Sequence, residues 1–141
     1  MASLYLDSNI VIVLLEEKGA RRRALRADLA KHAGPHGRCF VSDLVRLECR
    51  VKPIANGDTD LLREYDEYFA STGVAIAGIS SSVYDRATAI RAAFRYETAD
   101  ALHLAATIEA GCDAFVTADK RLAGFPDLTV EVLDPMVEPG T

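Results

Sequence analysis

Five short apolar runs alternate in this chain with longer segments of helical periodicity, and that alternation restricts the fold more than any other feature. The runs cover residues 4–6, 38–41, 73–76, 114–116 and 128–133. Strands that are separated by helices pair in parallel, because a parallel connection must return to the end of the sheet where it began. The pattern therefore predicts an α/β fold: a three-layer α/β/α sandwich with a central, mainly parallel sheet of four to five strands.

Capping and helix-breaking residues mark the ends of the predicted helices. Residues 7–9 are of the types preferred at helix N-caps, and Ser42 and Thr98 stand at the starts of two later helices. We expect Pro53 to end the third helix, because proline lacks the N–H that continues the hydrogen-bond ladder. The helices are expected at residues 10–17, 20–32, 43–51, 59–69, 80–96 and 99–110.

The composition is that of a soluble globular protein, with 141 residues, 50% of them hydrophobic. The longest apolar run, Ile10 to Leu15, is far shorter than the ~20 residues of a membrane helix, and the first residues lack the basic start of a secretory signal. The chain has no C-x-x-C pair among its cysteines, Cys39, Cys49 and Cys112, which argues against a disulfide framework or a zinc site. We expect one domain over residues 1–141, with a loose tail at 135–141, in a reducing cytoplasm and without membrane contact.

The formal net charge of −5 conceals an uneven distribution. Residues 1–96 are slightly basic, whereas residues 97–119 contain five acids and no Lys or Arg. An acidic average therefore does not exclude a nucleic-acid partner. Four arginines of the second predicted helix, Arg21, Arg22, Arg23 and Arg26, are candidates for RNA phosphate contacts, although a solvated helix face explains them equally well.

Four acidic residues occupy positions where a ligand site is expected. Asp7 and Asp119 each follow an apolar strand, at the end of a parallel sheet that carries sites in α/β folds. Glu48 and Asp100 lie on helices, and their apolar neighbours at helical spacing predict that both point toward the core. Four converging carboxylates would repel one another. A hard divalent cation, Mg²⁺ or Mn²⁺, relieves that repulsion and prefers oxygen ligands.

Each acid also has a simpler explanation. Asp7, Asp100 and Asp119 are each placed to cap or stabilise a helix start, and Glu48 alone could lie at the margin of its apolar stripe. We expect His103 to be a packed or surface histidine rather than a ligand. A zinc site at the i, i+4 pair of residues 32 and 36 is disfavoured, because glycine and proline between them break the helix.

The segments around these acids resemble PIN-domain ribonucleases, and more narrowly the VapC-type toxins of bacterial toxin–antitoxin pairs. The resemblance extends over residues 3–133, and its most specific part is Thr98-Ala99-Asp100-Ala101-Leu102-His103-Leu104-Ala105-Ala106. The other matching segments are residues 4–9, 42–48 and 115–119. Many members of the family have Thr after the first Asp, where this chain has Ser8, so a hydroxyl is retained.

The resemblance implies a metal-dependent endoribonuclease. Asp7 and Asp100 would be direct ligands of Mg²⁺ or Mn²⁺, and Glu48 and Asp119 would complete the acidic pocket. Three further side chains would orient the carboxylates and bound waters: Ser8, Asn9 and Thr117. The resemblance leaves open the RNA target, the number of metal ions and the carboxylate that acts as base.

The resemblance also implies protein partners. Proteins similar to VapC usually form homodimers and are held inactive by a cognate antitoxin, which lays a peptide along an apolar groove. Residues 10–15 and the stripe of Tyr65, Tyr68 and Phe69 are candidates for such surfaces, although stripes at helical spacing usually belong to the core.

Two other functions are weighed against this one. A phosphoaspartyl phosphatase of the haloacid-dehalogenase type also begins with an Asp after its first strand, but it requires Asp-x-Asp, and Asn9 stands at the third position here. A PIN-like module that binds RNA without cleaving it is the second alternative, and the presence of all four acids disfavours it. The chain has neither the G-x-S-x-G motif of serine hydrolases nor a phosphate-binding P-loop.

Overall fold

A five-stranded parallel sheet forms the centre of the molecule, as the alternating pattern predicts. The computed structural model describes residues 2–133, so the tail predicted at 135–141 lies outside the described residues. The strands are β1 Ser3–Leu6, β2 Arg38–Ser42, β3 Val74–Ala77, β4 Ala114–Thr117 and β5 Thr129–Val132, in the order β3-β2-β1-β4-β5. Every strand pair is parallel.

The first strand of the chain is the central strand of the sheet. In register, Tyr5 of β1 faces Phe40 of β2 on one side and Phe115 of β4 on the other. Leu4, Tyr5 and Leu6 are almost completely buried, as a short apolar run in the middle of a sheet must be. The ends of β1 and β4 therefore lie side by side, and so do the residues that follow them.

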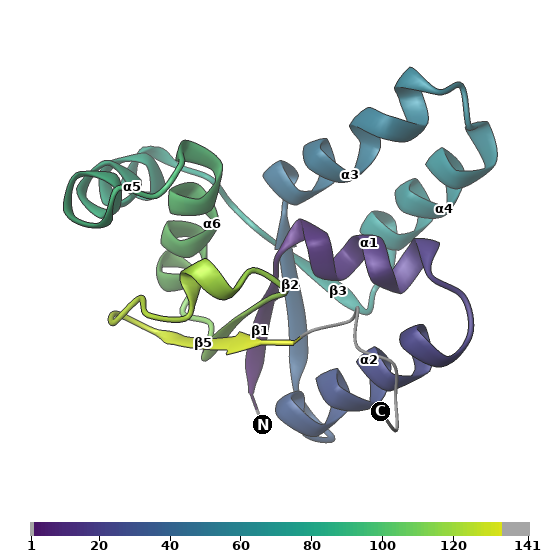
Figure 1. Ribbon diagram of the computed structural model, residues 1–141, viewed down its shortest axis with the longest axis horizontal. Helices are drawn as coiled ribbons and strands as arrows, with labels where there is room; N and C mark the ends of the chain where they lie inside the picture. Colours follow the sequence, from purple (N-terminus) through teal and green to yellow (C-terminus); the bar gives the residue numbers. More distant parts are fainter. Residues whose placement is uncertain (1, 134–141) are drawn as a thin grey trace.

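Helices cover both faces of the sheet, which gives the predicted three layers (Figure 1). Helices α1 to α4 lie on one side, and α5 and α6 pack together on the other. Their bounds are α1 Ser8–Glu16, α2 Ala20–Ala33, α3 Asp43–Ala55, α4 Thr59–Ala70, α5 Ser81–Phe94 and α6 Thr98–Glu109, and a short 3₁₀ helix, η1, covers Lys120–Leu122. Helix α6 is buried along most of its length, which agrees with its apolar sequence.

Two helix ends differ from the sequence prediction. Pro53 does not end α3, which continues to Ala55. The proline removes only its own N–H, and the next turn is completed by hydrogen bonds from Asn56 N to Lys52 O and from Asp58 N to Pro53 O. Helix α5 ends at Phe94 rather than residue 96, because the following residue takes a left-handed conformation and closes the helix.

Candidate functional site

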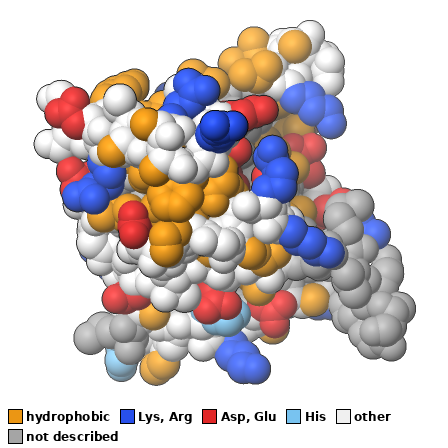
Figure 2. Space-filling model, turned by 60° about the vertical axis from the view of Figure 1, so that its left-hand side comes forward, with side chains coloured by type: hydrophobic (Ala, Val, Ile, Leu, Met, Phe, Trp, Pro, Cys, Tyr) orange, Lys and Arg blue, Asp and Glu red, His pale blue; other side chains and the backbone are white. Residues whose placement is uncertain are grey.

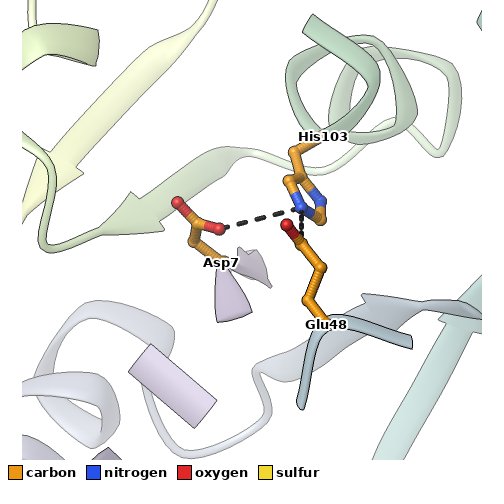
Figure 3. A group of neighbouring side chains, drawn as sticks. All are labelled: Asp7, Glu48 and His103. Atoms are coloured by element: carbon orange, nitrogen blue, oxygen red, sulfur yellow. Dashed lines mark hydrogen bonds and ion pairs between the residues drawn. The ribbon is translucent and has the colours of Figure 1, made fainter. Parts of the chain in front are cut away.

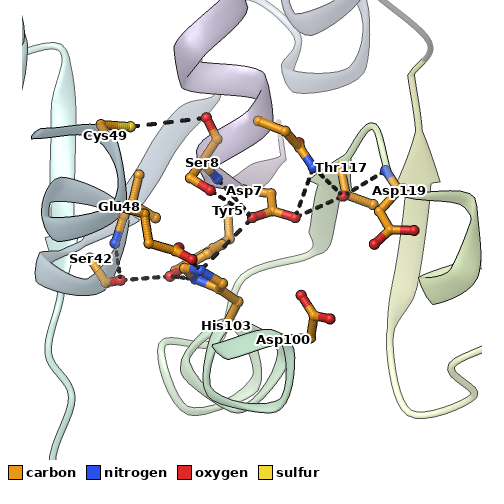
Figure 4. A network of polar contacts seen from close by, with 12 residues as sticks. Tyr5, Asp7, Ser8, Ser42, Glu48, Cys49, Asp100, His103, Thr117 and Asp119 are labelled. Carbon is orange, nitrogen blue, oxygen red and sulfur yellow. Dashed lines mark hydrogen bonds and ion pairs between the residues drawn. The ribbon is translucent and has the colours of Figure 1, made fainter. Parts of the chain in front are cut away.

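The predicted site residues converge where β1 and β4 end and where α3 and α6 begin (Figure 4). Asp7 is the N-cap of α1, and its backbone N–H bonds to Val116 O of β4. Asp119 is the N-cap of η1, two residues beyond β4. Both acids therefore cap a helix, as the simpler explanation proposed. Capping does not prevent them from lying in one site, because both side chains are also close to the other acids.

Asp7 is buried and is held by three neighbouring groups. Its Oδ1 accepts a hydrogen bond from the backbone N of Ser8 at 2.7 Å. Its Oδ2 accepts from Thr117 Oγ1 at 2.8 Å and from Asn9 Nδ2 at 3.3 Å. The hydroxyl of Thr117 also accepts from the backbone N of Asp119 at 3.0 Å, so one side chain links two of the acids.

Glu48 lies at the edge of the helical core stripe rather than within it. The buried positions of α3 are Val45, Cys49 and Pro53. Leu47 and Val51, whose apolar character suggested a core stripe around Glu48, are 58% and 57% exposed. Leu44, the remaining apolar neighbour of Glu48, does pack against the core. Glu48 therefore lies at the margin of the stripe, which is the simpler explanation left open above. The glutamate side chain nonetheless reaches the site, where it contacts His103.

His103, which we expected to be a packed or surface histidine, lies in contact with two of the acids. Its ring is 1% exposed, and Nε2 lies 2.5 Å from Glu48 Oε1 and 3.8 Å from Asp7 Oδ1 (Figure 3). Ligand atoms of these three residues all lie within 4.8 Å of one another. The available signal was spacing: His103 follows Asp100 by three residues on α6, which places both side chains on one helix face.

A buried hydrogen-bond chain orients the His103 ring. Nδ1 lies 2.8 Å from the Tyr5 hydroxyl, which in turn lies 2.7 Å from Ser42 Oγ. An ionised Glu48 only accepts hydrogen bonds, so Nε2 of His103 donates in this contact. The hydroxyl of Tyr5 is deeply buried, and this burial raises its pKa well above the ordinary value. Tyr5 thus stays protonated and remains a donor.

Asp100 and Asp119 share a cationic partner, Arg121. Asp119 accepts from Arg121 with both oxygens, at 3.0 Å from Nε to Oδ1 and 2.6 Å from Nη2 to Oδ2. Arg121 Nη2 also lies 3.5 Å from Asp100 Oδ2. The Arg121 hydrogen bonds lower the pKa of Asp119. Burial, followed by the charge of Asp7, raises the pKa of Asp100.

The donor set fits a hard divalent cation. Four carboxylates supply the anionic oxygens that Mg²⁺ and Mn²⁺ prefer. The raised pKa of Asp100 has the neighbouring charges of Asp7 and Asp119 among its causes, and a bound cation would offset that repulsion. Nε2 of His103 contacts Glu48 Oε1 and lies within the same group of possible ligand atoms.

The four arginines proposed for RNA contacts are not brought to the acidic site. Arg22 donates from Nε to Glu17 O and from Nη2 to Leu15 O, both at 2.9 Å, and so satisfies carbonyls at the end of α1. Arg21 pairs with Glu17 at 3.5 Å. Arg23 and Arg26 are exposed. The far end of α2 joins the start of β1, through a hydrogen bond from Ala2 N to Ala33 O, away from the strand ends that carry the acids.

Some residues of the two stripes proposed as partner surfaces are buried in the core, and others line a groove. Ile10, Val11 and Tyr65 are fully buried, which is the core explanation left open for both stripes. Other side chains of α1, α2 and α4 line a groove of about 590 Å³, which we call the α1–α4 groove; its apolar lining includes Leu14, Leu15, Leu29, Tyr68 and Val74. A separate apolar face on α3 consists of Leu47, Val51 and Ile54, all more than half exposed. Among the described residues, no helix is long and apolar enough to cross a membrane.

One family model matches this chain, and several solved structures share its fold. The pattern of the PIN domain family matches residues 4–128, whereas no curated protein matches the chain. A VapBC2 structure from Rickettsia felis, bound to a promoter DNA fragment, superposes with a TM-score of 0.74 at 16% identity, over 92% of this chain and 98% of that one. A toxin–antitoxin complex from Klebsiella pneumoniae gives 0.69 at 22% identity, over 94% and 97%. The toxin VapC20 of Mycobacterium tuberculosis, which cleaves the sarcin–ricin loop, gives 0.67 at 16%, over 89% and 98%.

Proposed function

This chain belongs to the PIN domain family, and on that premise we propose that it is a Mg²⁺- or Mn²⁺-dependent endoribonuclease that acts as the toxin of a toxin–antitoxin pair. The observation that carries the proposal is the convergence of Asp7, Glu48, Asp100 and Asp119 at the carboxyl ends of the central strands. Acids gathered there repel one another, and a bound divalent cation would offset that repulsion, which supports a metal-dependent reaction.

The residues have distinct roles in this proposal. Asp7 and Asp100 ligate the metal directly, and Glu48 and Asp119 complete the pocket. Ser8, Asn9 and Thr117 keep the Asp7 carboxylate in place through the hydrogen bonds described above. A bound divalent ion lowers the pKa of a water and neutralises charge on the phosphoryl oxygens. The chain contributes rigid placement of the acids at the open end of the sheet.

We assign the α1–α4 groove to an antitoxin peptide. Several of the similar structures are complexes of a toxin with its antitoxin. The groove offers an apolar floor of leucines together with Arg22, Arg26, Glu64 and Glu67 at its edges, which suits an amphipathic segment. The apolar face of α3 is assigned to a second copy of the chain in a homodimer.

RNA contacts require positive charge outside the acidic pocket. Of the four arginines on α2, Arg23 and Arg26 are exposed, whereas Arg22 bonds backbone carbonyls. We therefore propose that Arg23 and Arg26 contact phosphates remote from the cleaved bond. The place of action is the cytoplasm, where the proposed RNA substrate is found.

Mapping new RNA 5′ ends in cells after brief induction tests the proposal. Wild type is expected to generate defined ends and to arrest growth, whereas Asp7→Asn and Asp100→Asn do neither while keeping a native circular dichroism spectrum. Asp28→Asn, which makes the same charge change at an exposed position of α2, serves as the control and keeps activity.

Other outcomes point to the competing functions. RNA that is bound but yields no new ends would identify a non-cleaving module. Formation of a phosphoenzyme at Asp7 with a phosphate ester would identify a phosphatase. If the purified wild-type protein still cleaves RNA in an excess of chelator, the reaction does not depend on a metal ion.

A further inference from the structure

Arg121 contacts two of the four acids that are proposed to hold the metal ion. Its guanidinium contacts both oxygens of Asp119 and one oxygen of Asp100. These are oxygens of two of the four acids proposed to hold the cation. A guanidinium and a divalent ion cannot take the same carboxylate lone pairs, so the two compete for this side of the pocket.

The contact of Arg121 with the two acids can be replaced by another cation at small cost. The Arg121 side chain is 68% exposed, on a short 3₁₀ turn at the surface. Exposed ion pairs contribute little to stability, because water screens them and the long side chain loses freedom. A divalent cation with several carboxylate ligands therefore displaces the arginine at small cost.

Once released, the guanidinium has a natural alternative partner. Its planar fork of donors matches phosphate as well as carboxylate. Arg121 extends from the turn that directly follows Asp119, so a released side chain remains beside the acids. Figure 2 shows a similar mixture of charges on one face of the molecule, where Lys and Arg side chains stand beside acidic ones around a hollow.

We propose that Arg121 is a phosphate-positioning residue that metal binding releases. In the metal-free chain it neutralises Asp119 and Asp100, and when the metal binds it turns to an RNA phosphate next to the pocket. The metal-free protein is thus held in a state with weak affinity for RNA. This inference rests on the proposed function and adds to it a residue that couples metal binding to RNA binding.

Two binding measurements on Arg121→Gln test the coupling. The first is titration with Mn²⁺ alone, followed by the electron paramagnetic resonance signal of free Mn²⁺. Removing the competitor is expected to tighten Mn²⁺ binding by up to about fivefold, the upper end of the range for an exposed ion pair. Lys120→Gln is the control, because Lys120 is exposed, carries the same charge and pairs with no described acid.

The second measurement is binding of a fluorescein-labelled 2′-O-methyl phosphorothioate oligonucleotide, which resists cleavage, in saturating Mn²⁺. Arg121→Gln is expected to bind it more weakly, and the slope of log affinity against log salt is expected to fall by about 0.7, the value for one phosphate contact on a single strand. If Arg121 had only a structural role, its replacement would not change metal affinity and oligonucleotide affinity in opposite directions.

The outcomes separate this inference from the proposed function. Weaker Mn²⁺ binding by Arg121→Gln would show that the arginine holds the acids in place for the metal, and it would overturn the inference. Unchanged oligonucleotide binding, or an equal effect of Lys120→Gln, would overturn it as well. Failure of the wild type to bind Mn²⁺ at all would instead contradict the proposed metal-dependent function.

Discussion

His103 on α6 and Glu48 on α3 meet at 2.5 Å between Nε2 and Oε1, and this contact joins two helices from opposite faces of the sheet. The Glu48 side chain is 30% exposed and would otherwise sample several rotamers. The imidazole, itself held by Tyr5, fixes the carboxylate where the other acids converge. The position of Glu48 thus depends on a residue of the central strand with which it makes no direct hydrogen bond.

Removing one buried hydroxyl tests this dependence. In Tyr5→Phe, His103 Nδ1 and Ser42 Oγ lose their partner, which is expected to cost about 1–3 kcal/mol of unfolding free energy. The loosened ring no longer fixes Glu48, so Mn²⁺ affinity falls about tenfold. Urea unfolding and Mn²⁺ titration measure the two effects.

Tyr65→Phe is the matched control for that variant. Tyr65 is equally buried and donates its hydroxyl to Glu16 Oε2 at 2.5 Å, on a different part of the fold. It is expected to lose stability while keeping Mn²⁺ affinity. Equal loss of Mn²⁺ affinity in both variants would mean that general destabilisation, rather than the His103 contact, is responsible.

Thr117→Val is expected to weaken the metal site through Asp7 and Asp119 together. The valine has nearly the same shape, but it neither donates to Asp7 Oδ2 nor accepts from Asp119 N. We expect a loss of about 1–3 kcal/mol and a fall in Mn²⁺ affinity of about tenfold or more, with recovery in Thr117→Ser. In Thr107→Val, a buried hydroxyl bonded only to His103 O is removed, and Mn²⁺ affinity should be retained.

Asp100→Asn is expected to weaken metal binding without lowering the stability of the metal-free protein. Burial and the charge of Asp7 disfavour the ionised Asp100 in the metal-free chain, as its raised pKa indicates. The neutral amide removes that repulsion, so the metal-free variant should unfold at the same temperature as wild type or a higher one. Mn²⁺ at 100 times its Kd should stabilise wild type by about 2.7 kcal/mol and the variant far less. A variant that gains as much as wild type would exclude Asp100 as a ligand.

The buried thiols predict a loss of stability at alkaline pH. Burial raises the pKa of Cys112 to about 11 and that of Cys49 to about 12, from an ordinary value of 9.0. Above pH 9 the unfolded chain therefore releases thiol protons that the native chain keeps, so the free energy of unfolding falls as pH rises from 9 toward 11. Urea titrations at several pH values measure the slope, and replacement of both cysteines by alanine should reduce it.

The fold was more predictable from the sequence than the side-chain contacts were. Strand runs and caps depend on local patterns, and the structure reproduces the predicted alternation. Helix α3 shows where local patterns mislead: Leu47 and Val51 have the spacing of a core face but lie on the solvent side. A surface suited to a protein partner has the same apolar character as a core face, so periodicity alone cannot distinguish them.

The missed contacts in the site have a common cause. His103 contacts Glu48 and Asp7, and Arg121 contacts Asp100, because separate elements bring these residues together. Only the local relationships, His103 three residues after Asp100 and Arg121 two residues after Asp119, are visible in the sequence. Arg22 is the converse case, since a run of arginines suggested phosphate contacts whereas this side chain bonds two backbone carbonyls at the end of α1. Distant backbone groups compete for charged side chains, and that competition is visible only in three dimensions.

The order of the strands also determines when the acidic site can exist during protein synthesis. A nascent chain that has emerged from the ribosome as far as residue 110 already contains Asp7, Glu48 and Asp100. One edge of β1 is still unpaired at that stage, because its partner β4 begins at residue 114. Thr117 and Asp119 follow later still, so the complete set of acids cannot assemble until the chain has emerged beyond β4.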